Sequence, residues 1–323
     1  MKKVVTLGGG TGNFTVLRGL KKYDLDLSAI VSMADDGGST GVLRDELGVL
    51  PPGDVRQCLV ALSESSRLMR SLMNYRFDNG CLEGHNFGNI LLSALEKVTG
   101  SFETAVEETG KILSIRGKVI PVTTNQVRLQ MLMEDGKLLH GESEILMFKH
   151  PLTQFKSLYL EPFPKANPHA IDEIVNADLI VFGPGGLYTS LIPLLLVDGI
   201  SKALRDTKAK KIFVVNLMNK KLQTPGFKVG DYLREIKRFL GNDVFDYILV
   251  NKTKPDEELI KRYSEESEFI VNDLKDQRVI EADLIDSEIQ EYSKSDALAK
   301  TRALIRHDPK KLASVLAEVL KES

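Results

Sequence analysis

The stretch Lys3-Val4-Val5-Thr6-Leu7-Gly8-Gly9-Gly10-Thr11-Gly12-Asn13 decides the fold. Its first five residues form a short apolar run, and apolar residues at helical spacing follow from Phe14 to Leu20. This pattern predicts a buried strand, a glycine turn and a helix. Glycines let the backbone come close to a ligand, and free N–H groups at a helix start favour an anion. The sequence therefore predicts a nucleotide or phosphate pocket formed by Gly8, Gly9, Gly10, Thr11, Gly12 and Asn13.

Two known glycine motifs do not fit this turn. No Lys-Ser or Lys-Thr follows the glycines, so the turn is not a Walker loop. Gly8 and Gly10 match the dinucleotide fingerprint, but Asn13 stands where its third glycine would be. An NAD-type oxidoreductase is therefore disfavoured, and a tight turn without a ligand remains the plain alternative.

Composition indicates an ordinary globular protein. The chain has 323 residues, with 42% hydrophobic residues, 27% charged residues and a net charge of -2. No basic run favours nucleic acid, and the two cysteines form neither a disulfide framework nor a metal motif. The start of the sequence shows no signal-peptide pattern, and the most apolar stretch, residues 191–197, is too short to span a bilayer. We expect a cytoplasmic location, with no membrane or nucleic-acid partner.

Predicted strands alternate with predicted helices along most of the chain, which favours a mostly parallel sheet covered on both faces. We expect one α/β domain over residues 1–323. Residues 43–50 are poorly periodic and are predicted to be a connection. Asp135-Gly136 marks a hairpin, so an antiparallel β insertion is expected at about residues 118–161.

Three predicted strands each end in a glycine loop. Besides the first turn, residues 37–41 follow the second strand and residues 183–186 follow a strand at residues 178–182. Ligands of open parallel sheets bind outside the carboxyl ends of the strands, so the three loops are expected to surround one phosphorylated ligand. The further candidates are Gly37, Gly38, Ser39, Gly183, Gly185, Gly186, Tyr188 and Thr189, with Asn216 at the end of another strand.

Asp35 and Asp36 stand directly before the second loop. Neighbouring carboxylates can hold Mg²⁺, which prefers oxygen ligands and often binds through substrate phosphates. They could instead accept hydrogen bonds from ligand hydroxyls, as the acidic residue of dinucleotide folds does. Turn formation is the third interpretation, because Asp before Gly is a common turn former. The pattern leaves these three open.

Several polar residues have both a ligand-binding and a structural interpretation. Asp54 is predicted to be a helix N-cap, and Arg56 is either a phosphate contact or a surface arginine. Asn86 and Asn89 are amide contacts to a ligand or helix caps. No Gly-x-Ser-x-Gly, His-Glu-x-x-His or paired-Cys motif occurs, so any chemistry would rest on electrostatic positioning of phosphates.

Five ordered motifs resemble the signature set of the bacterial gluconeogenesis factors, which share a superfamily with 2-phospho-L-lactate transferase. They are Gly8-Gly9-Gly10-Thr11-Gly12, Asp35-Asp36-Gly37-Gly38-Ser39-Thr40-Gly41, Pro51-Pro52-Gly53-Asp54, Phe87-Gly88-Asn89 and Gly183-Pro184-Gly185-Gly186-Leu187-Tyr188-Thr189-Ser190. The similarity extends to Arg306-His307-Asp308, so it covers nearly the whole chain.

The resemblance implies a Rossmann-like three-layer αβα sandwich that binds a UDP-sugar, with UDP-N-acetylglucosamine as the expected ligand. It also implies a role in cell shape and wall synthesis during growth on gluconeogenic carbon sources, with a protein partner in wall synthesis. No catalytic activity is established for that branch. The alternative is a Mg²⁺-dependent phosphotransferase that resembles 2-phospho-L-lactate transferase. A homo-oligomer is compatible with either function.

The resemblance assigns Arg306 and Tyr263 to the UDP-sugar site, the first loop to the diphosphate, and the Asp35-Asp36 loop to the metal and acceptor region of the transferases. One departure concerns the loop after Asn216-Leu217-Met218, where residues 219–227 are longer and more basic than the family pattern. Gly186 and Leu194 also replace the serine and asparagine common in the family.

Overall fold

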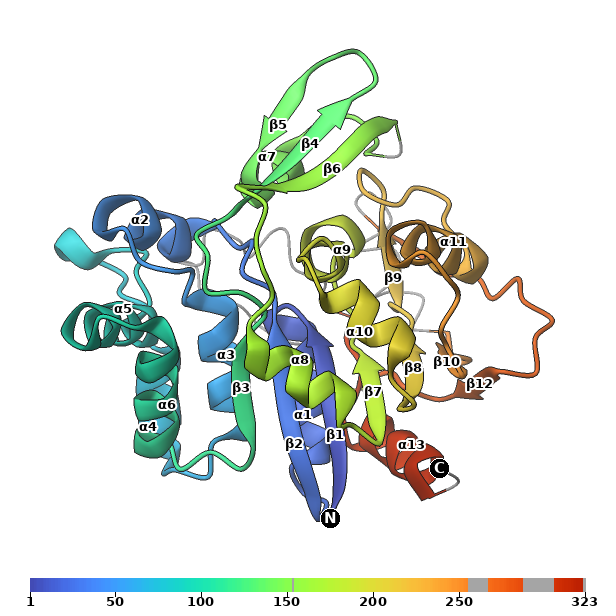
Figure 1. The fold of residues 1–323 in the computed structure, drawn as a ribbon, viewed down its shortest axis with the longest axis horizontal. Helices are drawn as coiled ribbons and strands as arrows, with labels where there is room; N and C mark the ends of the chain where they lie inside the picture. Colours follow the sequence, from blue (N-terminus) through green and yellow to red (C-terminus); the bar gives the residue numbers. More distant parts are fainter. Residues whose placement is uncertain (153, 255–266, 287–304, 322–323) are drawn as a thin grey trace.

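A computed structural model describes residues 1–152, 154–254, 267–286 and 305–321. These residues contain a seven-stranded sheet with the order β12-β10-β8-β7-β1-β2-β3, in which every neighbouring pair is parallel (Figure 1). Its strands are β1 (Lys2–Gly8), β2 (Leu25–Val31), β3 (Lys118–Pro121), β7 (Leu179–Phe182), β8 (Lys210–Val214), β10 (Tyr247–Asn251) and β12 (Val279–Ala282). The predicted α/β fold with a mostly parallel sheet is confirmed.

The strand order reverses between β1 and β7. β1 pairs with β2 on one side and with β7 on the other, so the chain leaves these two strands toward opposite halves of the sheet. All four residues of β7 are buried, as is usual for a parallel strand covered on both faces. In folds of this kind the reversal opens a crevice at the carboxyl ends of the strands.

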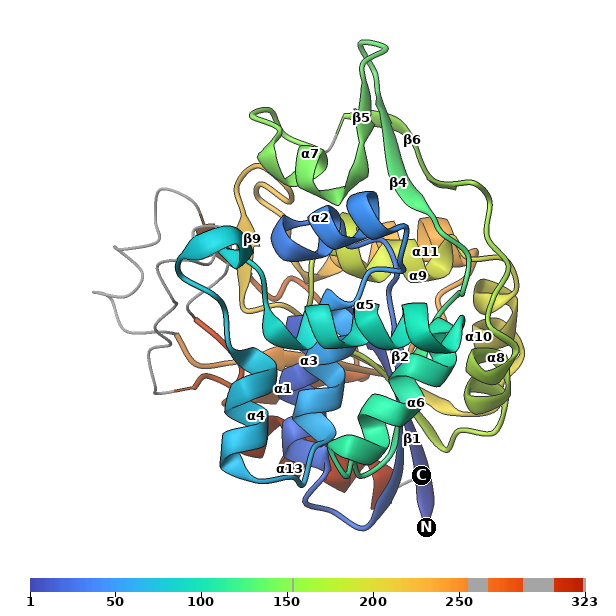
Figure 2. The same cartoon turned by 90° about the vertical axis from the view of Figure 1, so that its left-hand side faces the viewer.

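Helices cover both faces of the sheet (Figure 2). On one face lie α1 (Gly10–Leu20), α3 (Gly53–Leu62) and α13 (Pro309–Lys321). On the other lie α8 (Pro168–Val175) and α10 (Ile200–Asp206), with α11 (Val229–Leu240) beside α10. Asn167 caps the start of α8, because its side chain accepts a hydrogen bond from His169 N at 3.0 Å. None of the described helices is long and apolar enough to cross a membrane.

A second helical group lies beyond β3, at one edge of the sheet. It contains α2 (Gly38–Leu47), α4 (Arg67–Asn74), α5 (Phe87–Thr99) and α6 (Phe102–Ile112), with a short 3₁₀ turn at Gly80–Leu82. The prediction of a connection at residues 43–50 is wrong for most of its length, because α2 runs to Leu47. The predicted cap of α3 is also wrong: the helix begins at Gly53, and Asp54 lies inside its first turn.

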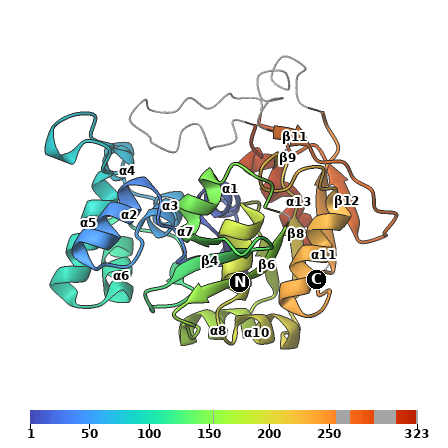
Figure 3. The ribbon, with the colours of Figure 1, turned by 90° about the horizontal axis from the view of Figure 1, so that it is seen from above.

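The antiparallel insertion contains β4 (Arg128–Met133), β5 (Leu138–His140), α7 (Gly141–Met147) and β6 (Phe155–Glu161), with the strand order β5-β4-β6. It begins ten residues later than predicted, because β3 pairs in parallel with β2 and belongs to the main sheet. Seen from above, the insertion lies over the end of the sheet (Figure 3). Close by, β9 (Met218–Lys220) pairs antiparallel with β11 (Ser267–Phe269).

Candidate functional site

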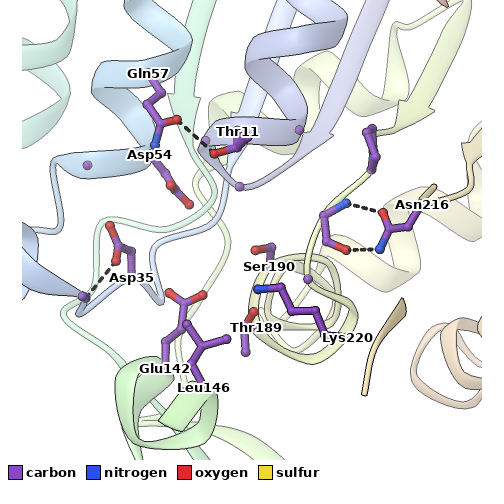
Figure 4. Close-up of a pocket in the computed structure, with 18 of the residues that line it drawn as sticks. Thr11, Asp35, Asp54, Gln57, Glu142, Leu146, Thr189, Ser190, Asn216 and Lys220 are labelled. Atoms are coloured by element: carbon purple, nitrogen blue, oxygen red, sulfur yellow. Dashed lines mark hydrogen bonds between the residues drawn. The ribbon is translucent and has the colours of Figure 1, made fainter. Parts of the chain in front are cut away.

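A cavity of about 290 Å³ lies at the reversal of the strand order, beyond the ends of β1 and β7 (Figure 4). Its volume is near the lower end of the range for small-molecule pockets, about 300–1,000 Å³. The first turns of α1, α2 and α3 all line it, through Gly10, Gly38 and Gly53. The residues that precede these three helices, Gly9, Gly37 and Pro52, make no side-chain cap hydrogen bond, and the positive dipole ends of the helices favour an anion in the cavity.

The first glycine turn forms one wall. Gly9, Gly10, Thr11 and Gly12 line the cavity, whereas Gly8 and Asn13 do not. Asn13 is fully buried, and its side chain packs against the backbone of Gly8 and Gly183. A β-carbon on Gly12 would lie 1.6 Å from Pro184 O. Glycine is therefore required at this position because the two turns meet there.

The third glycine turn faces the first. Asn216 holds it in place: Gly185 N donates to Asn216 Oδ1 and Asn216 Nδ2 donates to Gly185 O, each at 2.8 Å. Gly185, Gly186 and Thr189 line the cavity along with Asn216, but Gly183 does not.

Tyr188, another predicted contact, does not line the cavity. It is buried against Phe155, and its hydroxyl donates to Glu235 at 3.3 Å. Burial, together with the Glu235 carboxylate, raises the pKa of Tyr188. The plain interpretation of a tyrosine packed at a helix start therefore describes this residue.

The two aspartates before the second loop have different surroundings. Asp35 lines the cavity and accepts a hydrogen bond from Gly37 N at 2.9 Å. Asp36 does not line it; its carboxylate accepts from Ser143 N of α7 at 2.8 Å. Within the described residues no three His, Cys, Asp or Glu side chains are grouped so as to hold a metal ion. Of the two carboxylates, that of Asp35 lies at the cavity wall and that of Asp36 lies against α7.

The second loop itself lines the cavity with Gly37, Gly38 and Ser39. The Ser39 hydroxyl accepts from Asn86 N at 3.2 Å, which ties this loop to the start of α5. Asn86 caps α5, accepting from Asn89 N at 3.2 Å, and lies outside the cavity wall. Asn89 lines the cavity and accepts from Arg56 Nε at 3.0 Å. Asn86 is thus a helix cap, as the structural interpretation has it. Asn89 fits both interpretations, because it lies in the cavity wall and also holds Arg56.

Cations and carboxylates share the cavity wall. The cationic side chains are Arg56, Arg76, Lys220 and Arg306, and the carboxylates are Asp35, Asp54 and Glu142. Arg56 is buried and also donates to Asn74 Oδ1 at 2.6 Å, so it is held rigidly rather than being a surface arginine. The wall can therefore balance the charge of a diphosphate and still offer carboxylates to hydroxyl groups.

Glu142 has an unusual environment. It lies in the first turn of α7 and reaches the cavity from the insertion, where it faces the Thr189 hydroxyl (Figure 4). Burial, together with the charges of Asp35, Asp54 and Asp36, raises the pKa of Glu142 well above its ordinary value.

His307 also lines the cavity, and its surroundings lower its pKa. Its Nε2 donates to Val215 O at 3.2 Å, and burial lowers the pKa of this imidazole to about 4. His307 is therefore neutral at physiological pH, and it holds the segment that carries Arg306.

Several wall residues carry no signal in the sequence. Glu142 and Leu146 come from the insertion, Lys220 is the last residue of β9, and Gln223 and Thr224 come from the altered loop after it. Only the unusual length and basic character of that loop pointed toward it. Tyr263, which the resemblance assigned to the sugar site, lies outside the described residues.

Comparison with known proteins agrees with this fold. The family model described as 2-phospho-L-lactate transferase CofD matches residues 4–319. The gluconeogenesis factor of Bacillus subtilis is 40% identical over 323 residues, covering 99% of this chain and 98% of that protein. The gluconeogenesis factor of Listeria monocytogenes is 38% identical over 321 residues, covering 98% and 95%. A crystal structure of a UPF0052 family protein from Bacillus halodurans has a TM-score of 0.88 and 36% identity, covering 98% of this chain and 99% of that chain.

The sheet order, the glycine turns and the match over residues 4–319 define a Rossmann-like α/β protein, and the chain belongs to the CofD family. Within that family its curated relatives are named gluconeogenesis factors. The resemblance drawn from the five motifs is thereby confirmed.

Proposed function

We propose that this protein binds a UDP-sugar, UDP-N-acetylglucosamine, and acts as a regulator of cell shape and wall synthesis during growth on gluconeogenic carbon sources. The observation that carries the proposal is the convergence of three helix starts, at Gly10, Gly38 and Gly53, on one cavity. Such helix starts bind phosphate groups, and Arg306 reaches the same cavity from a distant part of the chain. A diphosphate linked to a sugar matches both the amide donors and the polar remainder of the wall.

The ligand can be tested by thermal denaturation with UDP-N-acetylglucosamine in the absence of metal. A ligand at a hundredfold excess over its dissociation constant stabilises the folded state by about 2.7 kcal/mol. We expect a shift in the melting temperature with this ligand and none with GDP. A shift with GDP or GTP that needs Mg²⁺, and no shift with any UDP-sugar, would contradict the proposal.

Arg306 provides a second test of the same site. Arg306→Ala should weaken binding of UDP-N-acetylglucosamine more than it lowers the melting temperature of the empty protein, because Arg306 lines the cavity. The matched control is Arg67→Ala, since Arg67 is exposed on α4 and does not line the cavity. An equal loss of stability in the empty Arg306→Ala protein would assign Arg306 a structural role.

A Mg²⁺-dependent phosphotransferase is the second candidate, favoured by the positions of Asp35 and Asp54 in the same wall. The Asp54 carboxylate lies against the first glycine turn, where a β-carbon on Gly10 would be 2.5 Å from it. Mg²⁺ commonly binds through one or two carboxylates and the phosphates of a substrate, so Asp35 and Asp54 would be its protein ligands. Metal dependence of nucleotide binding separates this candidate from the first.

A further inference from the structure

The insertion contributes a single carboxyl group to the cavity, that of Glu142. Its neighbours there are Asp35, Asp54 and the hydroxyl of Thr189. The Glu142 carboxyl group, which comes from the insertion, would repel a diphosphate placed beside it, whereas the arginines on the same wall attract one. The part of a ligand next to Glu142 is therefore uncharged and carries hydrogen-bonding groups.

The position of Glu142 is set by its neighbour in the chain and by Asp36. Ser143 N donates to Asp36 Oδ1 at 2.8 Å, and Ser143 Oγ donates to Asp36 O at 3.2 Å. The Asp36 side chain is only 7% exposed. This double contact fixes the first turn of α7 on the loop that carries Asp35.

Two further contacts hold the insertion at the same place. Gly141 has φ +85°, and a β-carbon there would lie 1.8 Å from Asp36 Oδ2, so the chain enters α7 directly against the Asp36 carboxylate. Arg128 of β4 lies 3.8 Å from Asp36 Oδ2 and pairs also with Asp45 of α2. The sheet and the helix of the insertion are thus both attached to the second loop.

From these contacts we infer that Glu142 determines which sugar the site accepts, by hydrogen bonding to a sugar hydroxyl or acetamido group, and that Asp36 is its positioning residue. The inference rests on the proposed function and deepens it, because it divides the site into a phosphate part made by the glycine turns and a sugar part made by the insertion. A carboxyl group suits the second part because it can accept from hydroxyls and, when protonated, donate as well.

The test compares binding of UDP and UDP-N-acetylglucosamine by isothermal titration calorimetry, in the wild type and in variants. Glu142→Ala should lower affinity for UDP-N-acetylglucosamine about tenfold or more and leave affinity for UDP within about twofold, because the lost hydrogen bond concerns the sugar alone. Glu142→Gln keeps the shape of the side chain and one acceptor, so its affinity for UDP-N-acetylglucosamine should lie between those of the wild type and Glu142→Ala. It replaces the alanine variant in the test if that variant does not fold.

Asp36 is tested by the same ratio of affinities. Asp36→Ala should reproduce the selective loss of affinity for UDP-N-acetylglucosamine. Asp36→Asn should keep most of that affinity, because the amide oxygen still accepts from Ser143 N. Glu144→Gln is the matched control: Glu144 belongs to the same helix, is exposed and does not line the cavity, so neither affinity should change.

Each outcome decides one claim. If the Glu142 variants lose UDP and UDP-N-acetylglucosamine equally, or lose neither, the inference is wrong while the proposed function stands. If Asp36→Ala leaves the ratio unchanged, the positioning role is wrong. A wild type that binds neither ligand overturns the proposed function, and the inference with it.

Discussion

Replacing Gly12 by alanine should destabilise the protein through one contact, between the first and third glycine turns. A β-carbon at this position would lie 1.6 Å from Pro184 O, whereas ordinary contact begins at 3.4 Å, so the two turns would have to separate by about 1.8 Å, the difference between those distances. The obstacle is a backbone carbonyl, which cannot rotate away as a side chain can. Overpacking of a well-packed site costs about 1–3 kcal/mol, and we expect the upper end of this range.

A loss of about 3 kcal/mol corresponds to a fall in melting temperature of about 4 °C for a chain of 323 residues, because the unfolding entropy is about 2.1 cal/mol/K per residue. It can be measured by differential scanning calorimetry and by urea denaturation of the protein without ligand. The control is Gly185→Ala in the opposite turn, where the added β-carbon would meet only the Ser190 β-carbon, at 3.6 Å. That variant should be neutral or slightly stabilised, because alanine restricts the unfolded chain more than glycine does. If Gly12→Ala melts like the wild type, or if both variants lose the same stability, the two turns do not meet as described.

Three further changes test other parts of the structure. Burial lowers the pKa of His307 to about 4 from 6.5, so between these pH values the unfolded chain binds a proton that the folded chain does not. As pH falls through this interval, the wild type should lose about 3 kcal/mol of stability relative to His307→Gln. Denaturation curves of the two proteins at each pH measure this difference. The raised pKa of Glu142 has the opposite effect on stability, which falls as pH rises from the ordinary value of 4.5 through the folded-state pKa. Glu142→Gln should therefore melt at a higher temperature than the wild type at neutral pH without ligand. The difference in melting temperature should disappear below pH 4.5. Ser101 accepts from Thr104 N at 3.3 Å as the cap of α6, so Ser101→Ala should cost about 1 kcal/mol and Ser101→Gly only a few tenths, by urea denaturation.

The strands and turns of the sheet could be predicted because their signals are local. The apolar runs at β1 and β7 are buried on both faces, and each is followed at once by glycines. The helix α11 likewise has a local signal, because its buried residues Tyr232, Ile236 and Leu240 recur at helical spacing. In each case the residues that define the element are neighbours in the sequence.

The helix α2 was missed because its residues form a helix only in the context of the whole fold. It begins within a glycine-rich segment, at Gly38, and has little apolar periodicity. Tertiary contacts stabilise it instead: Leu43 and Arg44 are buried, and Arg44 donates to Val127 O at the entrance to the insertion. Contacts of this kind override weak helix propensity and leave no local pattern.

The site shows the same division. The wall formed by the three glycine loops could be predicted, since parallel strands end at one edge of a sheet. The different surroundings of Asp35 and Asp36 could not, because Asp36 bonds to Ser143, 107 positions away. Glu142 was missed for the same reason, since nothing near it in the sequence relates it to the glycine turns. Lys220 belongs to the unusually basic segment after Asn216, but that departure from the family pattern does not place its side chain in the wall.

The helix starts and the side chains of the cavity wall recognise different parts of a ligand. The helix starts at Gly10, Gly38 and Gly53 belong to the framework of the fold, and backbone N–H groups recognise phosphate without regard to what it is attached to. Selectivity must then come from side chains on segments that can change without disturbing the sheet, and the insertion and the loop after β9 are such segments. On the proposed function, substitutions in the turns should weaken every nucleotide equally, and substitutions at Glu142 or Lys220 should separate one nucleotide from another. A turn variant that changes the preference among nucleotide sugars would contradict this separation of roles.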